Sequence, residues 1–204
     1  MTSPLILASG SPRRRGLLAA LGIGFVVRPA DIDETRFDDT PVAARVELLA
    51  RSKADACVAG AAEVVLAADT LVVLGGHVLG KPIDSADARK TLGLLRGREH
   101  EVVTGVALRW GGERVQASVL TTVEMRAYSD DEVAEFVGTG AAQDKAGAYA
   151  IQDESFHPVE RIEGCYCNVV GLPLGTVRRL LTTVRPDLSA LRQPVQCSGC
   201  PDWA

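Results

Sequence analysis

Residues 5–22, LILASGSPRRRGLLAALG, join an apolar run directly to three successive arginines. Residues 4–8 have the length and apolar content of a short buried strand. Ser11 is a favourable helix N-cap and Pro12 suits the first helical position, so we expect a helix that ends at Gly22. The stretch therefore predicts a strand, a tight turn and a helix, which together form the basic unit of an α/β fold.

The turn itself, SGSPRR at residues 9–14, carries groups that bind anions. A helix N-terminus presents free backbone N–H groups and the positive end of the helix dipole. Ser9 adds a hydroxyl, and Arg13 and Arg14 add guanidinium groups that can hold phosphate oxygens in pairs. The turn matches neither GxxxxGK[ST] nor GxGxxG. Two interpretations stand: a phosphate-binding turn, or a capped helix whose arginines are solvated.

The rest of the chain alternates strands and helices and also contains hairpins. We expect strands at 25–27, 101–110 and 114–126, on both sides of the Gly75–Gly76 turn, and in a closing hairpin of 159–162 and 166–170. Helices are expected from residue 41, at 85–95, at 129–137 and at 173–184, and a loop at 29–40. This pattern predicts an α/β protein with a mixed sheet flanked by helices. Residues 1–190 are expected to form one domain and residues 191–204 a loose tail.

Composition limits the function classes. The chain has 204 residues, 47% of them hydrophobic, which is enough for a substantial core. A net charge of −4 argues against a general nucleic-acid or anionic-membrane binder. No apolar stretch reaches the roughly 20 residues of a membrane helix, and the first residues lack a charged leader, so a cytoplasmic protein is expected.

The five cysteines are an odd number at irregular spacing, which argues against a secreted disulfide framework. Cys197-x-x-Cys200 has the spacing of half a zinc site or of a redox pair. Because no second CxxC or histidine pair accompanies it, we interpret Cys197 and Cys200 as free thiols of the tail.

Acidic and basic side chains elsewhere suggest phosphoryl chemistry. Asp69 follows an apolar strand, where carboxylates of α/β proteins point into a ligand crevice. Glu34 lies in the acidic loop, and Lys81 follows a hairpin. Taken singly, these residues also fit a turn aspartate, a solvated loop and an exposed lysine. Taken together, they supply cations for phosphates and carboxylates for Mg²⁺, which prefers one or two carboxylates plus substrate phosphates.

Seven ordered segments resemble the Maf family of nucleoside triphosphate pyrophosphatases, also named septum formation inhibitors. They cover about residues 4–182 and read LILASGSPRRRGLLAALG, DIDE, ARSKA, LAADTLVVLGGHVLGKP, LLRGREHEVVTGVAL, DKAGAYAIQ and NVVGLPL. The resemblance implies hydrolysis of a nucleoside triphosphate to its monophosphate and pyrophosphate. It also implies an elongated twisted sheet, two lobes around a nucleotide cleft as in inosine triphosphate pyrophosphatases, Mg²⁺ or Mn²⁺ as cofactor, and the capacity to form a homodimer.

The resemblance assigns roles residue by residue. The substrate-binding residues it implies are Ser9, Arg13, Arg14, Lys53, Thr70, Lys145 and Gln152. The catalytic residues it implies are Asp69, Lys81 and Glu34, with Glu34 and Asp69 as metal ligands. In the mechanism we expect, Asp69 helps to activate a water that attacks near the α-phosphorus, while arginines and lysines balance the phosphate charge and pyrophosphate leaves.

The branch of the family is indicated by Arg13, Thr70 and the stretch KAGAYAIQ, which resemble members acting on dTTP and UTP rather than on 7-methyl-GTP. One departure is IQDESFHP where the family continues IQG, which places Asp153 and Glu154 beside Gln152. Two rival functions remain: a non-catalytic nucleotide sensor that regulates cell division, and a nucleotidyltransferase that hands the nucleotide to an acceptor.

Overall fold

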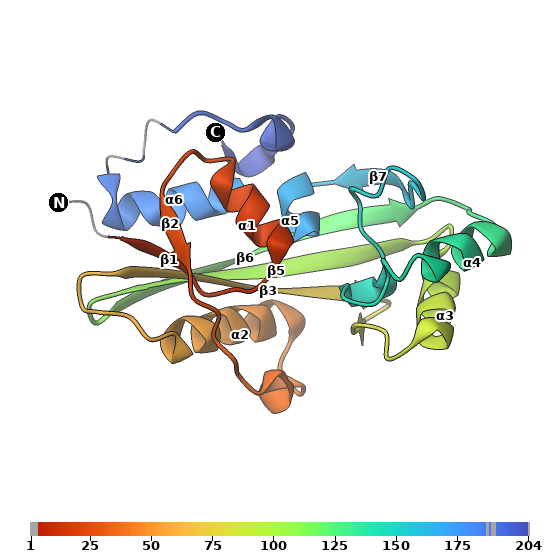
Figure 1. The fold of residues 1–204 in the computed structure, drawn as a ribbon, viewed down its shortest axis with the longest axis horizontal. Helices are drawn as coiled ribbons and strands as arrows, with labels where there is room; N and C mark the ends of the chain where they lie inside the picture. Colours follow the sequence, from red (N-terminus) through yellow and green to blue (C-terminus); the bar gives the residue numbers. More distant parts are fainter. Residues whose placement is uncertain (1–3, 187, 189–190, 204) are drawn as a thin grey trace. The chain divides into compact units, whose positions relative to one another are not determined.

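The sheet of the computed structural model is mixed, as the sequence predicts (Figure 1). The structure describes residues 4–186, 188 and 191–203. The strands run in the order β2-β1-β3-β5-β6-β7, and β4 pairs with β3. β1 is parallel to β2 and β3, whereas β4 is antiparallel to β3 and β7 to β6. The strands are β1 (Leu5–Leu7), β2 (Phe25–Val27), β3 (Val64–Leu74), β4 (His77–Leu79), β5 (Glu99–Trp110), β6 (Glu113–Met125) and β7 (Val159–Glu163).

The helices begin where capping residues predict them. Ser11 accepts the N–H of Arg14 at the start of α1, and Ser129 forms a capping box with Glu132 at the start of α4. The α-helices are α1 (Pro12–Ala19), α2 (Val42–Ala56), α3 (Ser85–Leu95), α4 (Asp130–Gly138), α5 (Tyr166–Val170) and α6 (Leu174–Val184). Short 3₁₀ helices are η1 (Glu34–Phe37), η2 (Ala146–Ala148), η4 (Val195–Cys197) and η5 (Pro201–Trp203). None of the described helices is both long and apolar enough to cross a bilayer.

The chain divides into two units. Unit 1 comprises Met1–Thr70, Val103–Val119 and Cys165–Ala204, and unit 2 comprises Leu71–Val102 and Leu120–Gly164. β3, β5 and β6 contribute residues to both units.

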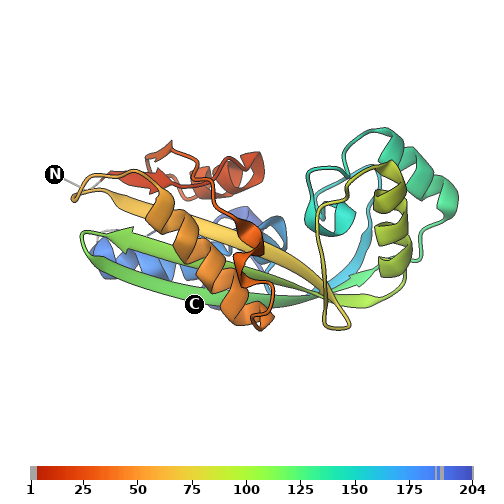
Figure 2. The ribbon, with the colours of Figure 1, turned by 90° about the horizontal axis from the view of Figure 1, so that it is seen from below.

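Unit 1 has helices on both faces of its strands (Figures 1 and 2). Leu5 and Leu7 of β1 belong to a buried cluster with α1 and α6, whereas Ile6 belongs to a second cluster with α2. Successive side chains of a strand point to opposite faces, so every residue of the three-residue strand β1 is buried. The continuous apolar run in the sequence therefore reflects a strand covered on both sides.

The same alternation in β3 directs two neighbouring polar residues to different helices. Ala68 lies in the cluster with α1, and Ala67 lies in the cluster with α2. Two residues further on, Thr70 follows Ala68 and contacts α1, while Asp69 follows Ala67 and contacts α2. The period of the strand thus decides which helix supplies each polar partner.

Unit 2 is built around α3, α4 and an aromatic cluster. The Phe136 and Phe156 rings stack at 4.4 Å between centroids, and Tyr128 packs on Phe156 at 4.9 Å. The buried Tyr128 hydroxyl donates to the Leu92 carbonyl over 2.8 Å. The loop residues Tyr128 and Phe156 therefore link α3 to α4.

The expectation of a strand at 166–170 was wrong, because these residues form α5. Val169 and Val170 favour a strand by propensity. However, Gly164 ends β7 at φ +128°, and Gly171 caps α5 in the left-handed region at φ +115°. The N–H of Gly171 and that of Leu172 both reach the Cys167 carbonyl, which closes the helix. The two glycines outweigh the β-branched residues between them.

The expectation of a loose tail was also wrong for residues 191–203. Arg178 of α6 lies over the Trp203 ring at 5.1 Å and donates to the Trp203 carbonyl at 2.9 Å. A Cβ at Gly175 would lie 2.6 Å from the Asp202 carbonyl oxygen, so the absence of a side chain allows this close approach. Cys197 is buried in the main cluster of unit 1. The end of the described chain therefore packs against α6.

Candidate active site

The turn between β1 and α1 holds one arginine in a fixed position. The guanidinium group of Arg14 donates to Ser9 Oγ at 3.3 Å, to Thr70 Oγ1 at 3.1 Å and to the Gly171 carbonyl at 2.8 Å. The Ser9 hydroxyl also accepts the backbone N–H of Ser11 at 3.3 Å. The structure therefore brings together three of the residues expected at the site, namely Ser9, Arg14 and Thr70.

A chain of hydroxyl groups continues from Thr70 into the core. Thr70 Oγ1 lies 2.9 Å from Thr104 Oγ1, and Thr104 donates to the Asn168 carbonyl at 3.1 Å. Both Thr104 and Asn168 are fully buried. Sequence reasoning missed these two residues, although each lies in a family segment, VVTGVAL and NVVGLPL. A threonine inside an apolar strand was the signal that could have identified Thr104.

Gly171 serves the site through its backbone. Its positive φ ends α5 and its carbonyl accepts Nε of Arg14. A Cβ at this position would lie 3.3 Å from Thr70 Oγ1 and 3.5 Å from Arg14 Nε. A larger residue would therefore be strained and would crowd both partners.

A lysine joins two carboxylates on the α2 side of β3. Lys53 Nζ lies 2.5 Å from Asp69 Oδ1 and 2.6 Å from Glu34 Oε1. The Asp69 and Lys53 side chains are 7% and 12% exposed, while that of Glu34 is 55% exposed. Glu34 is positioned by η1, which Asp33 caps by accepting the N–H of Thr35 at 3.0 Å. The expected acidic loop thus brings one carboxylate to the lysine and uses its neighbour as a cap.

The charges of this region influence each other. Burial lowers the pKa of Arg14, the negative charges of Asp69 and Glu34 oppose this shift, and Arg13 adds to it. An arginine with a lowered pKa still remains protonated at neutral pH. Arg13 stands on α1 directly before Arg14. Unit 1 therefore presents positive charge from α1 and buried negative charge from β3 within one polar region.

The donor set fits a magnesium or manganese ion, which uses one or two carboxylates together with phosphate oxygens. Asp69 and Glu34 supply the carboxylates and already share one cation, the Lys53 ammonium. As the described side chains stand, no group of three or more His, Cys, Asp or Glu is spaced to hold a metal ion. Two carboxylates alone are consistent with an ion that needs substrate oxygens to complete its coordination.

The three remaining expected residues, Lys81, Lys145 and Gln152, lie in unit 2. The N–H of Gly147 donates to the Gly80 carbonyl at 3.1 Å, which joins the loop of Lys145 to the turn that carries Lys81. Lys145 contacts Asp144 at 2.6 Å, whereas Lys81 and Gln152 are exposed. Unit 2 thus brings together the two loops that carry its expected residues.

The family departure after Gln152 forms a local turn. Asp153 accepts hydrogen bonds from the Ser155 hydroxyl at 2.7 Å and from the N–H of Phe156 at 2.9 Å. Burial of Asp153 opposes ionisation, but the hydrogen bonds from Phe156 and Ser155 lower its pKa overall. The carboxylate of Asp153 is therefore engaged in shaping its own loop.

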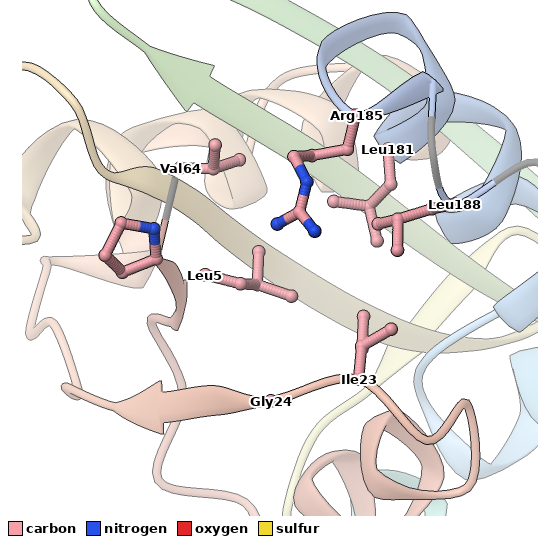
Figure 3. A pocket seen from close by; sticks show the side chains of 8 residues that line it. Leu5, Ile23, Gly24, Val64, Leu181, Arg185 and Leu188 are labelled. Atoms are coloured by element: carbon pink, nitrogen blue, oxygen red, sulfur yellow. The ribbon is translucent and has the colours of Figure 1, made fainter. Parts of the chain in front are cut away.

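A pocket of about 220 Å³ lies elsewhere in unit 1 (Figure 3). Leu5, Ile23, Leu181 and Leu188 line it, and the Arg185 side chain extends toward it. Leu5 and Val64 are the first residues of β1 and β3, whereas Ser9 and Asp69 follow the parallel pairing of Leu7 with Leu66. The pocket therefore lies at the amino ends of these strands, away from the carboxyl ends where α/β proteins place their ligands.

The fold and the polar region define an α/β protein in which an arginine-bearing turn at a helix N-terminus and a buried, lysine-paired acid lie in one unit. The chain matches the family model described as Maf-like protein over residues 4–184. It is 48% identical over 204 residues to the dTTP/UTP pyrophosphatase of Thermomicrobium roseum, covering 97% of this chain and 93% of that one. It is 50% identical over 185 residues to the dTTP/UTP pyrophosphatase of Anaeromyxobacter dehalogenans strain 2CP-C, covering 89% and 94%.

The chain belongs to the Maf-like protein family, which confirms the resemblance seen in the sequence. Among solved structures, a HAM1 protein from Coxiella burnetii is similar over 91% of this chain and 99% of that chain, at 17% identity and a TM-score of 0.48. The family assignment depends on the relatives and not on this superposition.

Proposed function

We propose that the protein is a nucleoside triphosphate pyrophosphatase that hydrolyses dTTP and UTP to the monophosphate and pyrophosphate. The observation that carries this proposal is the polar region of unit 1, in which Arg14 is fixed by Ser9 and Thr70 and Asp69 is paired with Lys53. Support also comes from relatives of 46–50% identity that bear the name dTTP/UTP pyrophosphatase.

Arg14 has the geometry of a phosphate ligand. Three of its donor positions are already occupied by Ser9, Thr70 and Gly171, so the group is held in place before any anion arrives. A prearranged guanidinium loses little side-chain entropy when it binds phosphate and can stabilise charge that develops in the transition state. We assign to Arg13 and Arg14 the binding of the triphosphate chain next to the N-terminus of α1.

Asp69 is the residue to which we assign activation of water. The residue is 5% exposed and lies in the middle of β3, which continues to Leu74, and not after the end of a strand as the sequence suggested. It orients the water and accepts a proton as oxygen attacks the α-phosphorus, and the bond from that phosphorus to the bridging oxygen breaks. Pyrophosphate leaves with the electron pair, and the ammonium of Lys53 and the arginines offset its charge.

Divalent metal dependence is part of the proposal. Asp69 and Glu34 are the side chains that would hold Mg²⁺ or Mn²⁺, and the ion would supply Lewis acidity toward phosphate oxygens and lower the pKa of bound water. Lys81, Lys145 and Gln152 are proposed to contact the substrate as well, because they match the family pattern. A cytoplasmic location and a homodimer are the remaining expectations.

The first test measures pyrophosphate release from a panel of nucleoside triphosphates with Mg²⁺. We expect dTTP and UTP to be the preferred substrates, and Asp69→Asn to lower kcat by about 100-fold or more, roughly 3 kcal/mol. Asp153→Asn is a matched control, since that carboxylate shapes a loop in unit 2. Near-normal turnover by Asp69→Asn would remove the assigned role. Binding without release would favour the sensor, and release only with an added acceptor would favour the transferase.

A further inference from the structure

Four cysteines that are distant in the sequence meet in unit 1. Cys165 and Cys167 flank the start of α5, and Cys197 and Cys200 flank the end of η4. Cys167 Sγ lies 2.8 Å from Cys197 Sγ, and Cys200 Sγ lies 3.2 Å from Cys165 Sγ. Cys165 also contacts Cys167, and Cys197 contacts Cys200, so the four sulfur atoms form a closed ring of contacts.

The sulfur atoms are surrounded by hydrogen-bond donors of the backbone. The N–H groups of Cys167 and Asn168 point at the Cys165 sulfur. The N–H of Leu174 points at Cys197, and that of Asp202 points at Cys200. These N–H groups are placed to donate hydrogen bonds to the sulfur atoms, as outer partners of metal ligands commonly do.

Burial makes such a cluster unusual unless it has a ligand. Cys165 and Cys167 are fully buried and Cys197 is 1% exposed. Four thiols side by side gain little from one another, since S–H is a weak donor and sulfur a weak acceptor. The spacing is C-x-C followed thirty residues later by C-x-x-C, and the second pair has the short separation common among zinc ligands.

We propose that Cys165, Cys167, Cys197 and Cys200 form a tetrahedral site for one Zn²⁺ ion. Four sulfur ligands are the donor set typical of structural zinc sites, and a closed set of four excludes a catalytic role for the ion. Binding releases the thiol protons, and the ion replaces the sulfur–sulfur contacts with metal–sulfur bonds. The proposal does not depend on the function proposed for the other residues of unit 1.

The present positions of the sulfur atoms are compatible with this site after small rotations. Tetrahedral zinc with bonds of about 2.3 Å places its sulfur ligands about 3.8 Å apart. The separations of 2.8 and 3.2 Å are shorter, so the side chains as they stand leave no room for an ion. They are also longer than the roughly 2.05 Å of a disulfide bond. A movement of each sulfur by less than about 1 Å would open the ring.

The ion would connect the end of the chain to α5. Residues 195–203 lie against α6 through Trp203. Through the ion, Cys197 and Cys200 would also be joined to Cys165 and Cys167 at the start of α5, the helix whose C-cap Gly171 accepts a hydrogen bond from Arg14. Loss of the ion would therefore loosen both η4 and α5. The site is structural in this view and acts on the rest of unit 1 only through the position of α5.

The test measures metal content in the full chain. The protein is produced in medium containing zinc, purified under reducing conditions without chelator, and analysed by elemental and native mass spectrometry. We expect about one zinc per chain. The double variant Cys197→Ser/Cys200→Ser should bring the zinc content close to zero, while Cys57→Ser, a buried cysteine outside the cluster, should retain it.

Two further measurements keep the inference falsifiable if the double variant fails to fold. A thiol-specific mercurial releases the zinc by binding the cysteines, and excess small thiol then removes the mercurial. The wild-type chain treated in this way should bind about one equivalent of zinc on titration with zinc chloride, and Co²⁺ in its place should give the visible absorption of a tetrahedral thiolate complex. Asp69→Asn should keep the zinc, which separates this site from the acidic pair. A reduced wild-type chain that binds no zinc would overturn the proposal, as would an intact mass lower by four hydrogen atoms, which indicates two disulfides.

Discussion

The two units treat their buried polar groups in opposite ways. In unit 1, Asp69 is buried as a charged group and is paired with Lys53. In unit 2, His100 lies 2.8 Å from the Tyr149 hydroxyl, and burial lowers the pKa of His100 to about 4 and raises the pKa of Tyr149. At neutral pH, unit 1 therefore contains buried charges, whereas the buried pair of unit 2 is neutral.

The difference shows that unit 1 carries the larger desolvation cost of buried charge. Removing a charge from water is expensive, and a buried ion pair often contributes less stability than apolar residues of the same volume. A neutral His–Tyr pair avoids most of that cost and keeps the hydrogen bond between His100 Nε2 and the Tyr149 hydroxyl, while His100 Nδ1 is buried without a partner among the described residues. Unit 1 keeps the charged pair of Asp69 in β3 and Lys53 in α2 despite this cost, and this is the physical reason why we assign the proposed reaction to that pair.

The largest expected effect comes from removing one partner of the buried pair. Lys53→Met leaves the Asp69 carboxylate buried without its ammonium, and we expect the free energy of unfolding to fall by about 3 kcal/mol. Urea denaturation measures this loss. Arg51→Met, at an exposed position of the same helix, should change stability by less than about 0.5 kcal/mol.

A double variant sharpens this prediction. Adding Asp69→Asn to Lys53→Met removes the uncompensated charge, so part of the lost stability should return. If the losses of the two single variants simply add, the pair is not coupled and the contrast between the units fails.

The second prediction concerns the neutral pair of unit 2. The pKa of His100 is about 4 in the folded chain and 6.5 in its ordinary state, so the unfolded chain binds the proton more tightly. The free energy of unfolding is therefore highest above pH 6.5, where His100 is neutral in both states, and it falls as the pH falls from 6.5 toward 4. We expect a loss of about 2 kcal/mol between pH 7 and pH 4.5 that is smaller in His100→Gln.

Denaturation curves at both pH values measure this difference. His157→Asn is the control: the residue is exposed, and asparagine tolerates its positive φ of 44°. If His100→Gln and the wild-type chain have the same pH slope, His100 is not the neutral buried group described for unit 2.

The third prediction tests the prearranged arginine of unit 1. Arg14→Lys keeps the charge but cannot donate to Ser9, Thr70 and Gly171 together. We expect kcat/KM for dTTP to fall about 10-fold, roughly 1.4 kcal/mol. Arg15→Lys, an exposed neighbour, should leave kcat/KM unchanged. Equal effects of the two substitutions would mean that charge alone matters and that the fixed geometry does not.

The smallest expected effect concerns an exposed side chain of unit 2. Gln152→Ala should leave kcat for the preferred nucleotide within about 3-fold and should change the ratio of kcat/KM between pyrimidine and purine triphosphates by a similar factor. Glu154→Ala, also exposed, is the matched control. A loss of all activity in Gln152→Ala would show that unit 2 carries part of the chemistry itself.

Much of the fold followed from local signals in the sequence. Ser11, Pro12 and Ser129 predicted helix starts, and the strands expected at 101–110 and 114–126 lie within one or two residues of β5 and β6. The exceptions depended on tertiary contacts. Residues 166–170 form a helix because two glycines close it at both ends, and the propensity of two valines does not reveal this.

The site shows the same division. The family motifs predicted six residues that the structure brings into one unit, namely Ser9, Arg14, Glu34, Lys53, Asp69 and Thr70. Thr104 was missed although a hydroxyl in an apolar strand marks it, whereas Gly171 could not be assigned because it acts through its backbone carbonyl. The partners of Cys197 and Cys200 were missed because they lie about thirty residues away and join the pair only in the folded chain.

The alternation along β3 has a consequence for how this chain can change over evolution. Asp69 and Thr70 are adjacent in sequence and serve opposite layers, so the strand works as a two-sided template. A substitution in residues 64–70 alters one contact, whereas an insertion or deletion of a single residue exchanges the two layers for every later position. The spacing of this strand is therefore more constrained than its composition, and divergence is expected to proceed by replacement and not by change in length.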